Sequence, residues 1–97
     1  MIHHIVMFKL KPGTSKDSQA VKDVFATLQS LPQTIPQICG WECGMNIAHR
    51  PIAYDVGLYS TFDNEQDLAT YVAHPDHQAM IGKWREIADW NIADWAK

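Results

Sequence analysis

The chain has 97 residues, of which 46% are hydrophobic and 20% charged, and its formal net charge at pH 7 is -3. A chain of this length makes one small domain, which we place over residues 1–97 and which buries roughly 60–70% of its unfolded surface. The slightly acidic balance excludes the basic footprint of a nucleic-acid-binding protein. No apolar run reaches the roughly 18 residues that a membrane span needs.

Cysteine is sparse, with only Cys39 and Cys43. In a strand these two residues would share a face but lie ~13 Å apart, too far for a disulfide or a shared metal. The N-terminal run also lacks the apolar core of a signal peptide. Two free thiols suit a reducing compartment, so we expect a cytoplasmic protein.

Residues 2–11 predict a strand that is apolar on both faces, because Val6 and Phe8 alternate with Ile5 and Met7. A strand of this kind is covered on both sides in the folded protein. Helices of so small a domain cover one side of the sheet. We expect a second copy of the sheet to cover the other side.

Residues 15–31 predict a helix that starts at an N-cap, Thr14 or Ser15, has Asp17 in its first turn and stops at Pro32. Its apolar residues recur at helical spacing: Val21, Val24, Phe25, Leu28 and Leu31.

Two further strands are predicted at residues 38–48 and 53–62, joined by a turn that contains His49-Arg50-Pro51. Large apolar side chains alternate along the first of them. We expect residues such as Trp41 to be buried where two sheets meet.

A second helix is predicted at residues 64–74, with Asp63 as N-cap and Gln66 completing a capping box. Pro75 ends it and begins a short helix that runs through Ala79 to Trp84. Residues 87–95 alternate as a fourth strand. A helix is the alternative there, because Ile87, Trp90 and Ala93 also fit the helical period.

The predicted order is therefore β-α-β-β-α-β, which is the ferredoxin-like α+β plan: an antiparallel four-stranded sheet with both helices on one face. The other face of such a sheet is left open. We expect a homodimer that packs two open faces together into a dimeric α/β barrel, with no nucleic acid and no membrane as a partner.

The segment from Tyr71 to His77 concentrates a phenol and two imidazoles around a proline. An unperturbed imidazole has a pKa near ~6.5 and can move protons at neutral pH. A histidine on a turn beside an apolar helix face can point into a cavity. The alternative is that His74 caps or packs and His77 is a solvated turn residue, because no partnering acid is evident.

A bound metal is not expected at His74 and His77, because only Asp76 lies between them and a zinc site needs further ligands. No motif in the chain indicates a cofactor.

Four parts of the sequence resemble the stress-responsive α/β-barrel (Dabb) family across almost the whole chain. They are the N-terminal His-His-Ile-Val-Met-Phe-Lys run, the Tyr54-Asp55-Val56 strand, Phe62 with the capped helix after it, and the run Tyr71-x-x-His74-Pro75-x-His77. The last is the most specific. The resemblance implies a dimeric α/β barrel of ferredoxin-like subunits.

Some plant members of that family are cofactor-free polyketide cyclases, which close a linear polyketide by an aldol step inside the subunit cavity. The resemblance implies that His77 is a general base, that Tyr71 binds or orients a carbonyl, and that His4 borders the cavity. The plant enzymes add a tyrosine from the first helix. Residues 15–31 contain none and offer Phe25 and Leu28 instead, which argues against the same substrates.

Two other functions stay open. One is a non-catalytic dimeric module that binds a small apolar molecule or associates with other proteins under stress, which the high aromatic content favours. The other is a cofactor-independent monooxygenase or a haem-handling protein, in which Trp84, Trp90 or His77 would serve.

Overall fold

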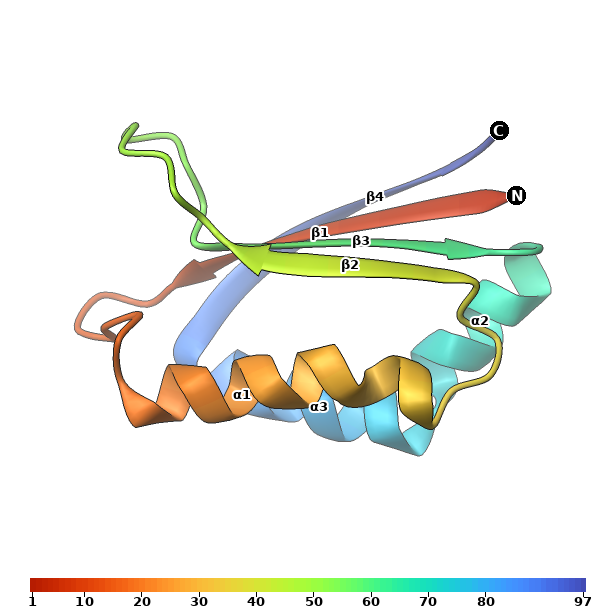
Figure 1. Ribbon diagram of the computed structural model, residues 1–97, viewed down its shortest axis with the longest axis horizontal. Coiled ribbons are helices and arrows are strands. Elements are labelled where there is room, and N and C mark those ends of the chain that lie inside the picture. The colour runs from red at the N-terminus through yellow and green to blue at the C-terminus, as the bar shows by residue number, and fades with distance from the viewer.

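The computed structural model describes all residues, 1–97, as one sheet with helices packed on one side of it (Figure 1). The elements in chain order are β1 (Ile2–Leu10), α1 (Gln19–Ser30), the 3-10 helix η1 (Leu31–Gln33), β2 (Gly40–Met45), β3 (Val56–Phe62), α2 (Glu65–Ala73), α3 (Pro75–Ile87) and β4 (Ala88–Ala96). This confirms the ferredoxin-like α+β prediction, with the second helical segment divided into α2 and α3.

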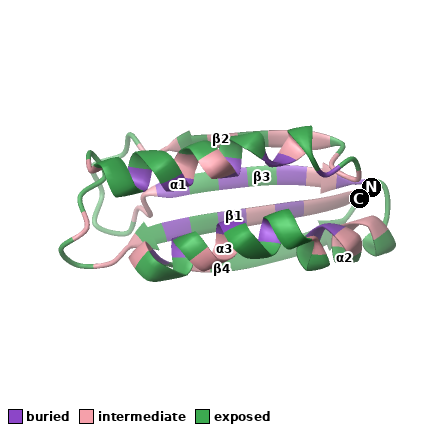
Figure 2. Ribbon diagram, turned by 90° about the horizontal axis from the view of Figure 1, so that it is seen from below, coloured by how far each residue is buried: buried purple, intermediate pink, exposed green.

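The sheet is antiparallel, with the strand order β2-β3-β1-β4. β1 is central, and its Val6 faces Leu58 of β3 on one side and Ile92 of β4 on the other. α1 runs beneath the β2–β3 half of the sheet and α3 beneath the β1–β4 half (Figure 2). The two termini lie side by side, and the amide of Lys97 donates to the carbonyl of Met1 at 3.0 Å.

The core lies between the sheet and the helices. Alternate residues of β1 and β3 point into it, and Figure 2 shows the buried positions of the helices turned toward the strands. Phe8 stacks on Trp84 of α3 with the ring centroids 4.2 Å apart. The largest fully buried side chains are Trp84, Tyr71, Phe8 and Phe62.

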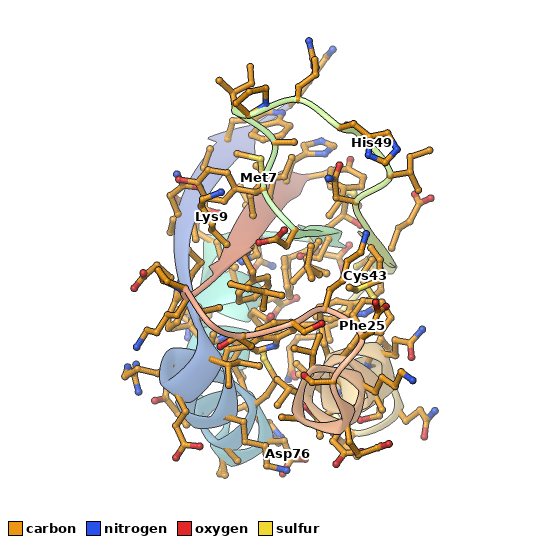
Figure 3. All side chains as sticks on the ribbon, turned by 90° about the vertical axis from the view of Figure 1, so that its left-hand side faces the viewer. Met7, Lys9, Phe25, Cys43, His49 and Asp76 are labelled. Carbon is orange, nitrogen blue, oxygen red and sulfur yellow. The ribbon has the colours of Figure 1, made fainter.

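The opposite face of the sheet carries no helix. In Figure 3 Met7 and His49 lie on this open side, whereas Phe25 and Asp76 lie on the helix side. The connection between β2 and β3, residues 46–55, rises above the open face (Figure 1). This connection leaves two large apolar side chains almost bare, Ile47 at 90% and Ile52 at 78% exposure.

Both predicted helix caps are displaced toward the C-terminus. Ser18, not Thr14 or Ser15, caps α1, because its side chain accepts a hydrogen bond from the amide of Val21. Ser15 instead accepts from the amide of Asp17, in the turn that precedes the helix. The predicted start of that helix is therefore wrong by one turn.

Asn64, not Asp63, caps α2, and its side-chain oxygen accepts from the amide of Asp67 at 2.8 Å. The predicted capping box at Asp63 and Gln66 is therefore wrong. Asp63 accepts a hydrogen bond from the thiol of Cys39 at 3.3 Å instead. Strand ends are also trimmed, since β2 begins at Gly40 and β3 at Val56.

The C-terminal third confirms the break at Pro75, which opens α3 as its first residue. α3 extends to Ile87 and is longer than the short helix predicted there. The last segment pairs with β1 from Ala88 to Ala96, so the helical alternative for it is wrong.

Trp41 lies on the helix side of the sheet and not on the open side. It faces Ser60 in the β2–β3 ladder, and its ring centroid is 6.0 Å from that of Tyr71 in the core. Its neighbour Glu42 points the other way, as strand alternation requires. The prediction that Trp41 is buried between two sheets is therefore wrong.

No helix in the chain combines the length and the apolar character required for crossing a membrane.

Candidate active site

A cavity of about 260 Å³ opens between the helix side of the sheet and helices α2 and α3. Its apolar wall includes Val6, Phe8, Leu58, Met80, Ile81, Trp90 and Ile92. The three side chains that the resemblance singled out, His4, Tyr71 and His77, all line it. Two sequence segments separated by most of the chain thus contribute polar groups to one small apolar space.

The local fold explains how these side chains converge. His4 has the same strand parity as Val6 and Phe8, so it points to the helix side of β1. Tyr71 lies in the last turn of α2 and is 1% exposed. The chain then breaks at Pro75, and His77 falls in the first turn of α3. The proline break therefore turns His77 back toward Tyr71.

His74 and His77 have different fates. The Nδ1 atom of His74 accepts a hydrogen bond from the amide of Asp76 at 3.0 Å, so His74 is the N-cap of α3. The capping interpretation is therefore right for His74. His77 is 9% exposed and lies within a helix, so its interpretation as a solvated turn residue is wrong.

The protonation of the His77 ring follows from its hydrogen bond. Its Nδ1 atom lies 2.9 Å from the carbonyl oxygen of Val72, and a carbonyl only accepts, so Nδ1 carries the hydrogen and donates it. A neutral ring then has a lone pair on Nε2. Burial, with smaller contributions from His4 and His74, lowers the pKa of His77 below its ordinary value of 6.5. His77 is therefore neutral at pH 7.

Tyr71 lies between the two histidines. Its ring centroid is 4.4 Å from that of His77 and 6.0 Å from that of His4. Burial raises the pKa of Tyr71 above its ordinary value of 10.0, so the phenol keeps its proton and remains a hydrogen-bond donor. The buried side-chain polar atoms that lack a partner belong to Trp41 and Trp84, not to Tyr71. Tyr71 is nevertheless among the residues that line the cavity.

His4 has an acid partner that the residue patterns do not predict. Nδ1 of His4 is hydrogen-bonded to a carboxylate oxygen of Asp94, and the two residues face each other across the β1–β4 ladder. Because a carboxylate accepts, Nδ1 donates and Nε2 of His4 is left free. The register between β1 and β4 brings the two residues together. Alternation of residues along each strand does not predict that register.

Of the two tryptophans named for the monooxygenase or haem function, only one lines the cavity. Trp90 lines the cavity, whereas Trp84 is fully buried against Phe8 and does not. The chain contains no group of three or more His, Cys, Asp or Glu side chains placed to hold a metal ion. Cys39 and Cys43 are free thiols.

A second hollow, of about 720 Å³, lies on the open face under the β2–β3 connection. Its lining includes Ile5, Met7 and Tyr59 from the sheet and Ile47 and Ile52 from the connection. On the same face Nδ1 of His3 lies 2.6 Å from the hydroxyl of Tyr59. This hollow is broad and apolar, and it contains none of the three candidate residues.

Comparison with known proteins gives consistent matches over the whole chain. The family model of the Stress responsive A/B Barrel Domain matches residues 2–97. An uncharacterized protein of Streptomyces coelicolor is 42% identical over 95 residues, which cover 98% of each chain.

Solved structures give the same result for the fold. A dimeric protein of unknown function with a ferredoxin-like fold from Bacteroides fragilis has a TM-score of 0.86 at 27% identity, over 99% of this chain and 95% of that one. Hydroxynitrile lyase from Passiflora edulis has a TM-score of 0.83 at 16% identity, over 97% of this chain and 90% of that one. The second likeness is one of fold alone.

Proposed function

The chain belongs to the stress-responsive A/B barrel domain family, and from this premise we propose that it is a homodimer whose subunits each move a proton on a small, largely apolar carbonyl compound. The cavity beneath the sheet would hold the compound. His77 would be the general base, Tyr71 the donor to the carbonyl oxygen, and His4 a second polar group at the cavity wall. Closure of a polyketide-like chain is one reaction of this class.

The proposed step begins at a carbon next to the carbonyl group. Nε2 of His77 takes a proton from that carbon, and the electrons of the broken C–H bond move toward the carbonyl oxygen to form an enolate. The hydroxyl of Tyr71 donates a hydrogen bond to this oxygen as its negative charge develops. The enolate carbon then attacks a second carbonyl of the same molecule, and the alkoxide that forms takes the proton from His77. In the absence of a second carbonyl, the enolate carbon takes the proton back from His77.

The observation that carries the proposal is the hydrogen bond from Nδ1 of His77 to the carbonyl of Val72. It leaves the lone pair on Nε2, and the lowered pKa of His77 keeps that lone pair available at pH 7. Tyr71 is in ring contact with the same imidazole and retains its proton. A neutral base and a neutral donor side by side form the pair that enolisation needs.

The pair of His4 and Asp94 supports the same proposal in a positioning role. The carboxylate fixes the orientation of the His4 ring, whose centroid is 6.0 Å from that of Tyr71. A ring held in this way leaves Nε2 to face the phenol or the ligand. We assign Asp94 the role of a positioning residue, since it is not among the residues that line the cavity.

Dimer formation is part of the proposal and has its own support. The open face leaves Met7 at 43%, Tyr59 at 38% and Trp95 at 43% exposure, which is much apolar surface for one side of a small domain. The related protein from Bacteroides fragilis is dimeric. Packing of two open faces would bury this surface and leave the cavity beneath each sheet accessible from the helix side.

The function is tested by hydrogen–deuterium exchange at a carbon next to a ketone. The probe is 4-phenyl-2-butanone in D₂O at neutral pH, followed by proton NMR. The protein should accelerate exchange beyond an equal concentration of free imidazole. His77→Gln should lower the protein-catalysed rate by about 10²-fold or more, and Tyr71→Phe by a smaller factor.

His3→Gln is the matched control, since it removes an imidazole from the open face and should leave the exchange rate unchanged. Circular dichroism of each variant confirms that it is folded. An exchange rate equal to that of free imidazole, or one that His77→Gln leaves intact, would contradict proton transfer at this site.

Simple ligand binding is the second candidate function, and the mostly apolar lining of the cavity favours it. Here His77 and Tyr71 would complete the wall and orient a ligand without reacting. Native mass spectrometry of freshly purified protein would then detect a retained small molecule. His77→Gln would keep that molecule bound.

A further inference from the structure

The cavity lining contains a positively charged side chain and no acidic one. Among the residues that line it, Arg85 is the only Lys or Arg, and there is no Asp or Glu. His77 is neutral at pH 7 because burial lowers its pKa. An apolar space with one cation at its wall attracts a ligand with one anionic group.

The guanidinium of Arg85 makes no ion pair within the protein. The ion pairs of the chain join His4 to Asp94 and His74 to Asp76, and neither includes Arg85. Glu86 and Asp89 are close in sequence, yet neither makes an ion pair with it. The guanidinium carbon lies 5.7 Å from the ring centroid of Trp90, which itself lines the cavity. The charge is thus held over an aromatic face with its donors free.

The positions of the lining residues on α3 give the direction of a ligand. His77, Ile81 and Arg85 follow one another at four-residue intervals, so they form one stripe along the helix, and all three line the cavity. His77 is in the first turn and Arg85 in the last. Their Cα atoms are about 12 Å apart along the helix axis at ~1.5 Å per residue. The reacting group and the cation therefore lie at opposite ends of an apolar strip.

We propose that the ligand is an oxo acid whose carboxylate binds the guanidinium of Arg85 while its carbonyl lies beside Tyr71 and His77. This inference rests on the proposed function and specifies the class of its substrate. The apolar body of the acid would lie between Phe8, Ile81 and Trp90. A cavity of about 260 Å³ has the volume of about nine water molecules of the liquid, so the acid is small.

The test compares 6-oxoheptanoate with 6-oxoheptanamide, two ketones of the same length that differ in charge at one end. Binding is measured by isothermal titration calorimetry. The wild-type protein should bind the acid about tenfold or more tightly than the amide, because a guanidinium–carboxylate contact is charge-assisted. Arg85→Gln should remove this preference by weakening the acid alone, and Arg85→Lys should keep part of it.

Lys83→Gln is the matched control, because it removes an exposed positive charge from the same helix without touching the cavity lining. It should preserve the preference for the acid. Deuterium exchange at the carbons next to the ketone is measured on the same samples, so that binding and proton transfer are read separately.

Equal affinity for acid and amide, or a preference that survives Arg85→Gln, overturns the oxo-acid inference even where exchange depends on His77. A preference that Arg85→Gln removes, with no catalysed exchange in the wild type, supports the carboxylate site and overturns the proton-transfer function. If the wild-type protein neither prefers the acid nor accelerates exchange, both the oxo-acid inference and the proton-transfer function are overturned.

Discussion

His3 and His4 are adjacent in the chain but lie on opposite faces of the same sheet. His4 is buried, is hydrogen-bonded to Asp94 and lines the small cavity on the helix side. His3 is partly exposed, stacks on Trp95 with the ring centroids 5.4 Å apart, and borders a broad apolar surface. Strand parity therefore decides which imidazole lines the candidate cavity and which lies on the open face.

The two faces also differ in what supports them. The helix side is covered by α1, α2 and α3, and its side chains form the core. The open side has only its own residues and the β2–β3 connection (Figure 1). We therefore expect substitutions on the helix side to change folding stability and substitutions on the open side to change self-association.

The largest expected effect is on the helix side. Trp84→Ala removes a fully buried ring that stacks on Phe8, and it should lower the free energy of unfolding by about 3–5 kcal/mol in urea denaturation. Trp95→Ala on the open side is the control and should cost less than half as much. Equal losses would mean that the two faces contribute equally to the folded subunit.

Next in size is an effect on the open side. Met7→Glu puts a charge in the middle of the exposed apolar surface and should weaken self-association by about 100-fold, ~2.7 kcal/mol, in sedimentation experiments. Gln29→Glu adds the same charge on an exposed position of α1 and should leave association unchanged. A wild-type chain that is monomeric at micromolar concentration would refute the homodimer.

The two adjacent histidines give a smaller and more direct contrast. In the Met7→Glu background, which removes the contribution of a partner, His4→Gln should lower the free energy of unfolding by about 1–3 kcal/mol. The reason is that Asp94 loses its buried donor. His3→Gln should change it by less than about 1 kcal/mol. Thermal unfolding of both variants tests this, and a larger loss for His3→Gln would reverse the comparison.

The smallest expected effect is a pH dependence. Because burial lowers the pKa of His77 in the folded state, the unfolded chain binds more protons once the pH falls below the ordinary value of 6.5. The free energy of unfolding should therefore be fully retained above that pH and fall as the pH drops below it. The slope from this one group is at most about 1.4 kcal/mol per pH unit.

His77→Gln should flatten that slope. Urea denaturation at a series of pH values from about 7.5 to 5 measures the difference. Identical slopes in the wild type and in His77→Gln would mean that His77 titrates in the folded protein as it does in the unfolded chain.

Much of the fold could be predicted because its signals are local. Alternation in β1, the apolar stripe of α1 and the break at Pro75 each depend on residues a few positions apart. The position of the N-cap of α1 is harder to predict, because several residues near it are suitable. Thr14, Ser15 and Ser18 are all good N-caps by residue type, and the preceding turn decides among them.

Some residues of the candidate site can likewise be predicted from local sequence, and others cannot. Tyr71 and His77 were identified from one short run, but the partner of His4 lies at the other end of the chain and depends on the β1–β4 register. The prediction for Trp41 is wrong because its strand has two faces and periodicity does not say which of them meets the helices. Residue spacing gives the faces of an element, and only tertiary packing says what each face contacts.

The bond between His4 and Asp94 joins residues 90 positions apart. During synthesis on a ribosome, the first of these residues emerges long before the second. β1 would have one unpaired edge until β4 leaves the ribosome. Contacts between residues this far apart in sequence form slowly. The contact between His4 and Asp94 would thus form only after translation has reached β4, and a nascent chain stopped before Asp94 would have His77 and Tyr71 but not the carboxylate that binds His4.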